Sequence, residues 1–168
     1  MSDLVKRLHI LLISLMLTGL GGAVLAQGAN VAFGTLAQET DLPVEVTSDN
    51  LSVDQGNGTA VFTGNVVITQ GEMRLAAPRV LVVYLEGQRG IERMEATGGV
   101  TLVSGPDAAE SDRADYSIAN GEIVMTGNVL LDQGLNALSA DRMTVQLSEG
   151  TAQMSGRVRT IIQQGGDN

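Results

Sequence analysis

The side chains in this sequence that could perform acid–base chemistry are carboxylates. Asp112 and Asp115 could be considered as the pair of a glycoside hydrolase, which needs two carboxyl groups about 5–10 Å apart in a cleft. Asp112, however, shares a repeated sequence position with Asp49 and Asp141. A structural role at a corner of the fold is therefore the favoured interpretation, and we expect no catalytic residue and no enzymatic activity.

Residues 1–26 have the pattern of a signal peptide. Lys6 and Arg7 precede an apolar run, and small residues lead to Ala26. The alternative is an uncleaved membrane anchor, although the run is short compared with the roughly 20 apolar residues that span a bilayer. We expect export and cleavage, with a second possible cleavage site at residues 35–37.

Cleavage after residue 26 would also remove the chain's single lysine and single histidine, Lys6 and His9. The remaining sequence has no Cys, His, Lys or Trp, so it offers neither a His-dependent nucleophile nor a His or Cys zinc site. We therefore expect no metal and no cofactor. Eight arginines against eighteen acidic residues give a net charge of −10, which argues against nucleic acid as a partner.

A repeat built on glycine runs through the rest of the chain. The glycines are 34, 29 and 29 residues apart. Apolar residues stand two positions before and two positions after each of them, and the positions directly beside them are mostly Thr, Ser or Asn. Such alternation is typical of a half-buried β-strand, and helical periodicity is absent outside the leader. The sequence therefore predicts an all-β protein of many short strands. The four glycines are Gly64, Gly98, Gly127 and Gly156.

Glycine inside a strand usually marks a bend, a bulge or a close backbone approach. Four glycines in register predict a curved wall whose strands all bend along one line. A second marker, at Ala77, Ser111 and Ala140, follows the first three glycines by 13 residues and is expected to open a second type of strand. One interval is five residues longer than the others, and the excess is assigned to a turn at residues 86–90.

The apolar side of these strands would form a continuous interior of Val, Leu, Ile and Met. Few aromatic residues are present to fill it. An incompletely filled trough would suit hydrocarbon, because each buried methylene contributes about 0.8 kcal/mol and methionine adapts to irregular shapes. The alternative is a dry, packed core, which residue spacing alone favours.

Three motifs in the first repeat carry a family resemblance. Ser-Asp-Asn-Leu-x-Val-Asp, Ala-x-Phe-x-Gly-Asn-Val and Ala-x-x-x-x-Val-x-Tyr resemble the LptA/OstA-like family of lipopolysaccharide-transport proteins. The resemblance covers residues 43–164, and we expect a signal peptide at 1–26, a flexible lead-in at 27–42 and a tail at 165–168. It implies a twisted β-jellyroll of repeated antiparallel strands with an open-ended apolar interior.

The resemblance also implies a function in the periplasm. Members shelter the acyl chains of lipopolysaccharide during transport from the inner to the outer membrane, stack head to tail by pairing of edge strands, and join LptC-like and LptD-like partners. Transferred to this sequence, the edge residues are Val44, Val46, Val158 and Thr160. The lining residues are Phe62, Val66, Ile68, Met94, Val100, Leu102, Met125, Val129, Leu131, Met143 and Met154.

Two further functions remain open from the sequence. An LptC-like member of the same fold family would keep residues 8–25 as a membrane anchor. A structural β-repeat protein that polymerises would have a filled interior and bind no lipid.

Overall fold

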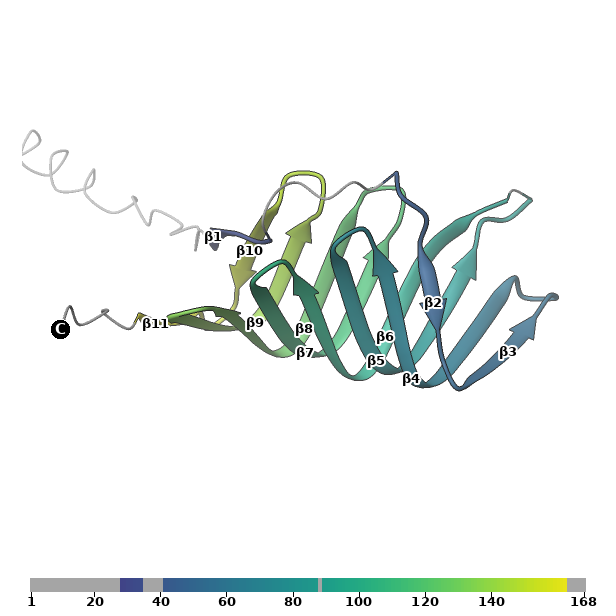
Figure 1. The fold of residues 1–168 in the computed structure, drawn as a ribbon, viewed down its shortest axis with the longest axis horizontal. Helices are drawn as coiled ribbons and strands as arrows, with labels where there is room; N and C mark the ends of the chain where they lie inside the picture. Colours follow the sequence, from purple (N-terminus) through teal and green to yellow (C-terminus); the bar gives the residue numbers. More distant parts are fainter. Residues whose placement is uncertain (1–27, 35–40, 88, 163–168) are drawn as a thin grey trace, which may run out of the picture.

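The computed structural model describes residues 28–34, 41–87 and 89–162, and in these ranges it is entirely β (Figure 1). The strands pair antiparallel in one long sheet with the order β1-β10-β9-β8-β7-β6-β5-β4-β2, while β3 also pairs with β4 and β11 also pairs with β9. The all-β prediction is confirmed. The strands are β1 (Ala29–Ala32), β2 (Glu45–Thr47), β3 (Asn50–Asp54), β4 (Thr59–Gln70), β5 (Met73–Tyr84), β6 (Ile91–Ser104), β7 (Asp107–Ser117), β8 (Glu122–Gln133), β9 (Asn136–Gln146), β10 (Thr151–Ser155) and β11 (Arg159–Ile162).

The long strands bend where the sequence repeat places its glycines. Gly64, Gly98, Gly127 and Gly156 all have positive φ angles, between 73° and 95°. The pairing registers of β4 to β9 shift at the same level, which identifies a line of β-bulges across the sheet. The bend predicted from the glycines is therefore confirmed.

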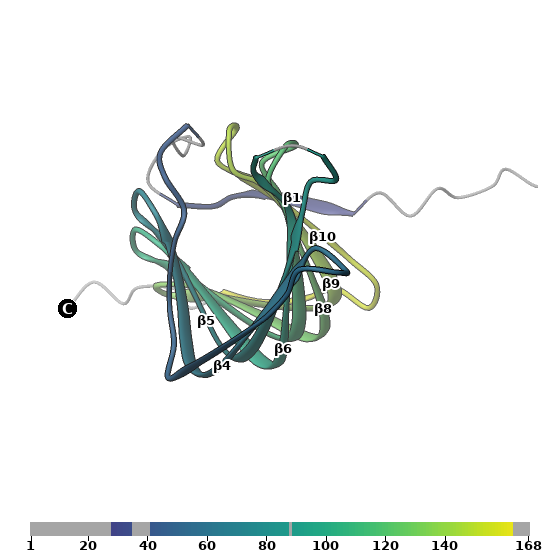
Figure 2. The same cartoon turned by 90° about the vertical axis from the view of Figure 1, so that its right-hand side faces the viewer.

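The bulge line divides the sheet into two halves, which we call wall A and wall B. Wall A contains β2, β11 and the strand segments that lead to the turns at Gly71, Gly105 and Gly134. Wall B contains β1, β3, β10 and the strand segments that lead to the turns at Gly58, Gly121 and Gly150. Viewed along the stack of strands, the two walls curve around a common interior (Figure 2).

The second sequence marker was interpreted incorrectly as the start of a strand. Ala77, Ser111 and Ala140 lie inside β5, β7 and β9, directly beside the bulge. The reason is geometric. A bulge places two residues of one strand opposite one residue of its neighbour. The strand with the glycine keeps its alternation, whereas the neighbour breaks it without ending, as β5 does between Ala77 and Val80. The longest repeat interval exceeds the others by five residues, and this excess lies in the turn between Tyr84 and Ile91, as expected.

The lead-in differs from the expectation of a segment without regular structure. Residues 29–32 form β1, which pairs with β10 at the opposite end of the chain. The short polar-apolar stretch Ala-Asn-Val-Ala shows too few alternations to be recognised alone, and its partner is more than 100 residues away. The proposed signal peptide and tail lie outside the described residues. Within the described ranges, no helix has the length and apolar character needed to cross a membrane.

Candidate functional site

The side chains predicted to line an apolar interior are brought together between the two walls. Ten of the eleven are buried, with 0–2% of their surface exposed, and the remaining one, Phe62, is partly buried and packs against the same cluster. Alternation places them on one face of each strand, and the bulges keep this face inward in both walls. Met94 and Met143, whose direction rested on alternation alone, belong to the same buried cluster.

A polar contact joins the two walls inside this cluster. The hydroxyl of Tyr116, in wall B, donates a hydrogen bond to Oε1 of Gln70, in wall A. Burial raises the pKa of Tyr116 to about 12, so the hydroxyl is neutral and able to donate at neutral pH. The sequence did not identify this pair, because the two residues are 46 positions apart and belong to different strands.

The interior reaches solvent at the end of the sheet formed by β3. Leu51 and Val53 lie directly opposite Phe62 and Ala60 on β4, and cross-strand partners of this kind share a face of the sheet. Their side chains are therefore on the inward face, yet they are 56% and 57% exposed. Both residues belong to the motif Ser-Asp-Asn-Leu-x-Val-Asp, which by itself does not identify them as site residues. The signal was available in the apolar alternation of β3.

The predicted edge residues lie at the two ends of the sheet. Val46 is in β2, which pairs with β4, and Val44 immediately precedes this strand. Thr160 is in β11, which pairs with β9, and Val158 lies between β10 and β11. All four are at least partly exposed, and every residue of β3 and β11 is exposed. The terminal strands thus carry backbone groups suited to pairing with another strand.

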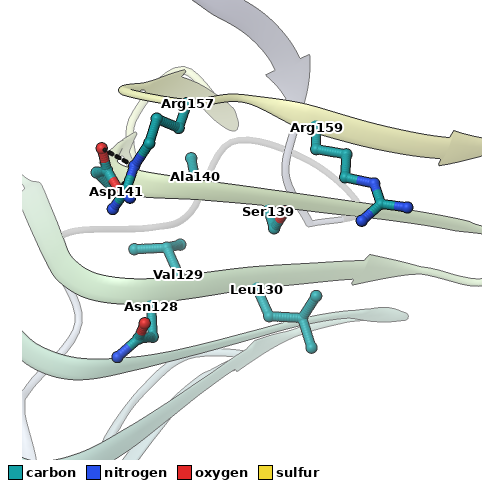
Figure 3. A pocket seen from close by; sticks show the side chains of 8 residues that line it. All are labelled: Asn128, Val129, Leu130, Ser139, Ala140, Asp141, Arg157 and Arg159. Carbon is teal, nitrogen blue, oxygen red and sulfur yellow. Dashed lines mark hydrogen bonds and ion pairs between the residues drawn. The ribbon is translucent and has the colours of Figure 1, made fainter.

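The repeated aspartates Asp49, Asp112 and Asp141 form side-chain contacts at the bulges. Asp112 accepts a hydrogen bond of 2.9 Å from Nδ2 of Asn128, and Asp49 accepts one of 2.8 Å from Nδ2 of Asn65. At the last bulge Asp141 forms an ion pair with Arg157, with 2.6 Å between Nη2 and Oδ1 (Figure 3). The hydrogen bonds from Arg157 lower the pKa of Asp141.

Asp115, the other carboxylate of the hypothetical catalytic pair, has a separate partner. It accepts hydrogen bonds from Arg113, which also reaches Glu95. These carboxylates raise the pKa of Arg113. Because Asp112 is engaged at the bulge and Asp115 on the adjacent strand segment, the two serve different structural contacts.

An open pocket of about 390 Å³ lies beside the last bulge. It is formed by β8, β9 and the segment around β11, as Figure 3 shows. Its residues are Asn128, Val129, Leu130, Ser139, Ala140, Asp141, Arg157 and Arg159. Two of the charged residues of this pocket, Asp141 and Arg157, form an ion pair with each other. Among the described residues, no group of three or more His, Cys, Asp or Glu side chains is arranged to hold a metal ion.

Comparison with known proteins gives relatives that include lipopolysaccharide export proteins. The chain is 28% identical over 104 residues to the lipopolysaccharide export system protein LptA of Escherichia coli K12, covering 58% of this chain and 56% of that protein. The matched part of this chain thus spans little more than half the length of that relative. A protein of Rhizobium meliloti strain 1021 is 32% identical over 124 residues, covering 67% of each chain.

The fold has a solved counterpart. LptH of Pseudomonas aeruginosa, described as the LptA-homologous periplasmic component of the lipopolysaccharide transport device, matches with a TM-score of 0.66. The match covers 76% of this chain and 99% of LptH at 18% identity. A family model described as LptA/(LptD N-terminal domain) LPS transport protein matches residues 45–151, which is more than half of the chain. The chain therefore belongs to the LptA/LptD N-terminal family of lipopolysaccharide transport proteins, a family of carriers rather than enzymes.

Proposed function

We propose that this protein is a periplasmic carrier that shelters the acyl chains of lipopolysaccharide between walls A and B on the way to the outer membrane. The observation that carries the proposal is the continuous cluster of buried aliphatic and methionine side chains that extends through successive strands, with the exposed Leu51 and Val53 on the inward face at the β3 end. Family membership supplies the substrate class.

The interior would have to widen to admit a lipid. The lining side chains are nearly inaccessible in this structure, with at most 2% exposure at the ten buried positions. Acyl chains would therefore enter by separating the walls, replacing contacts between side chains with contacts to methylene groups. Such an exchange keeps the apolar surface away from water, so its free-energy cost is small compared with exposing the interior. The Tyr116–Gln70 hydrogen bond is one contact that must break or move.

Head-to-tail stacking by edge-strand pairing would extend the interior from one copy to the next. The exposed strand β3 presents inward-facing Leu51 and Val53 at one end, and β11 is exposed at the other. The same edges would join LptC-like and LptD-like partners at the inner and outer membranes. Stacking matters because a lipid leaving one interior would otherwise meet water.

The decisive experiment is photocrosslinking in cells with a probe at Val129, which is buried on the inward face. The matched control is Leu130, the next residue on the same strand, which is exposed on the outward face. Adducts with lipopolysaccharide at position 129 and none at 130 are expected. A folded protein in active transport machinery that gives no adduct at 129 would refute acyl binding at this level of the interior.

The near-complete burial of the lining side chains is also consistent with a competing function, a structural β-repeat that assembles without lipid. That function predicts a permanently packed core, and hence no lipid adduct at Val129 or at any other lining position. An LptC-like anchored protein is separated by the mature amino terminus. A terminus at Gln27 would exclude a retained anchor, because residues 8–25 would then be absent.

A further inference from the structure

The edge of wall B next to β10 is occupied by the chain's own amino-terminal segment. Residues 28–34, which we call the strap, include β1, whose four residues pair with β10 from Met154 to Thr151. The strap approaches β10 closely before β1 begins, since a Cβ added to Gly28 would lie 2.6 Å from the carbonyl oxygen of Met154. At this end of the sheet, therefore, β10 has no free edge (Figure 1).

β1 stands in the same relation to β10 as β3 does to β4. Both run antiparallel to their partner from the bulge line towards the turns of wall B. Ala29 lies opposite Met154, two residues before Gly156, and Leu51 lies opposite Phe62, two residues before Gly64. By the same register, Val31 of β1 corresponds to Val53 of β3. β1 thus has the direction and register that β3 of a following copy would need in a continuous antiparallel stack.

The end of the strap contacts the turns of both walls. The N–H of Phe33 donates to the carbonyl oxygen of Gly150 in wall B, at 2.9 Å. The N–H of Gly34 donates to Oδ2 of Asp107 in wall A, at 2.8 Å, and Nε2 of Gln133 donates to the carbonyl oxygen of Ala32, at 2.7 Å. Phe33 is buried in the core cluster. Figure 2 shows this part of the chain crossing from β1 towards the opposite wall.

From this register equivalence we propose that the strap is an exchangeable strand. In the monomer β1 covers the β10 edge, and during head-to-tail assembly β3 of a second copy displaces β1 and pairs with β10. This inference rests on the proposed stacking and adds to it a step that controls when stacking occurs. Displacement also removes Phe33 from the core and releases the contacts at Asp107 and Gly150, so the two interiors become continuous.

Two opposing changes make the exchange reversible. The incoming strand would bring Leu51 and Val53 to positions that β1 fills with Ala29 and Val31, and it would bury apolar surface that is now exposed. Release of Phe33 and of its backbone hydrogen bond opposes the exchange. Because the incoming strand belongs to another molecule, the balance depends on protein concentration.

The exchange can be blocked by a disulfide between β1 and β10. Asn30 and Gln153 are directly opposite and exposed, and such partners lie about 4.5–5.5 Å apart at Cα, within the range of a disulfide. The pair Asn30→Cys with Gln153→Cys would introduce cysteines into a chain that has none. The control pair is Glu110→Cys with Leu130→Cys, which joins two exposed, directly opposite residues of β7 and β8 away from the edge.

The measurement is the mass of the mature protein by light scattering across a concentration series, with each disulfide oxidised or reduced. The locked strap should raise the concentration for half-maximal assembly at least tenfold, and reduction should restore it. The control pair should leave it unchanged. Deletion of residues 28–34, or the milder Phe33→Ala, should lower that concentration. A wild type that stays monomeric while the deletion assembles would also support the inference.

Three results would overturn it. The first is assembly of the locked protein at the wild-type concentration, because β1 would then remain in place. The second is a monomeric deletion variant. The third is a mature amino terminus at Gln38, since the strap would have been removed with the leader. If Val129 still crosslinks to lipopolysaccharide, these results refute strap exchange but not the proposed binding of acyl chains. Conversely, loss of crosslinking with normal strap exchange would refute acyl-chain binding and leave strap exchange standing.

Discussion

Two bulges on the same line of the sheet reach similar backbone geometry with different chemistry. At one, Asp112 on β7 lies against Gly127 and bonds to Asn128 on β8. At the other, Pro78 on β5 lies against Gly98 on β6. The glycines at positions 98 and 127 have φ angles of 95° and 81°, and the residues that follow them also have positive φ.

The proline bulge lacks contacts that the aspartate bulges have. Asp49 and Asp141 donate their backbone N–H groups to the carbonyl oxygens of Gly64 and Gly156, at 2.9 Å, whereas Pro78 has no N–H to donate. Its ring also cannot accept a hydrogen bond from a neighbouring side chain. The bend therefore depends on the glycine backbone, while the side-chain contacts add stability to a bend that forms without them.

The largest effect is expected for Gly127→Ala. A methyl group at this position would lie 2.4 Å from Oδ2 of Asp112, and alanine would be strained at a φ of 81°. Strain of about 1–2 kcal/mol and loss of a hydrogen bond worth about 1 kcal/mol together predict a decrease of about 2–3 kcal/mol in the free energy of unfolding. Urea denaturation would measure it.

The control for this variant is Gly134→Ala. Gly134 has a φ of 67° in a turn, and nothing lies within 4 Å of the added methyl group. It should show the backbone strain alone. Equal losses at positions 127 and 134 would contradict the role assigned to Asp112.

At the proline bulge, Gly98→Ala should cost about 1–2 kcal/mol, close to the turn control. The nearest atom to the added methyl group is Cγ of Pro78 at 3.3 Å, a contact that a small shift can relieve. A loss as large as that of Gly127→Ala, measured by the same urea titration, would show that the two bulges are equally intolerant and that the comparison is wrong.

A double-mutant cycle tests whether Asp112 is the cause of the difference. Asp112→Ala removes the hydrogen bond to Asn128 and should cost about 1 kcal/mol by itself. In this background Gly127→Ala should cost about 1 kcal/mol less than in the wild type, because the carboxylate that obstructs the methyl group has gone. Additive losses in the unfolding free energy would refute a direct clash.

The sequence was sufficient for the features that repeat locally. The glycines at intervals of 29 residues and the alternating Val, Leu and Met positions predicted both the bend and the inward face, since each depends on residues within one strand. It was insufficient for contacts between distant segments. The Tyr116–Gln70 bond and the pairing of β1 with β10 are set by how the walls close, and no local periodicity encodes them.

The marker at Ala77, Ser111 and Ala140 shows a different limit. Its spacing was recognised correctly, but it was assigned to the start of a strand rather than to the neighbour of a bulge. Alternation continues through Gly127 in β8 but is broken in β7 between Ser111 and Ala114. A single sequence therefore records one bulge as two unrelated features, a glycine in one strand and a break in another. The pairing register is needed to see that Asp112 and Gly127 belong to one structural unit.

The smallest effect is a gain in stability from converting the proline bulge into the other type. Pro78→Asp with Gly99→Asn would supply a backbone N–H, a carboxylate and a side-chain amide in the arrangement that Asp112 and Asn128 have. The expected increase in the free energy of unfolding is up to about 1 kcal/mol, because the net value of each added hydrogen bond is partly offset by the strain of placing Asn at positive φ. Each single substitution should give less than the pair, since each introduces one partner of the hydrogen bond. A double variant that is less stable in urea than both single variants would contradict this prediction. The backbone at Gly98 and Gly99 would then have a geometry that an aspartate–asparagine contact cannot stabilise. The two bulges would be different structures rather than two forms of one.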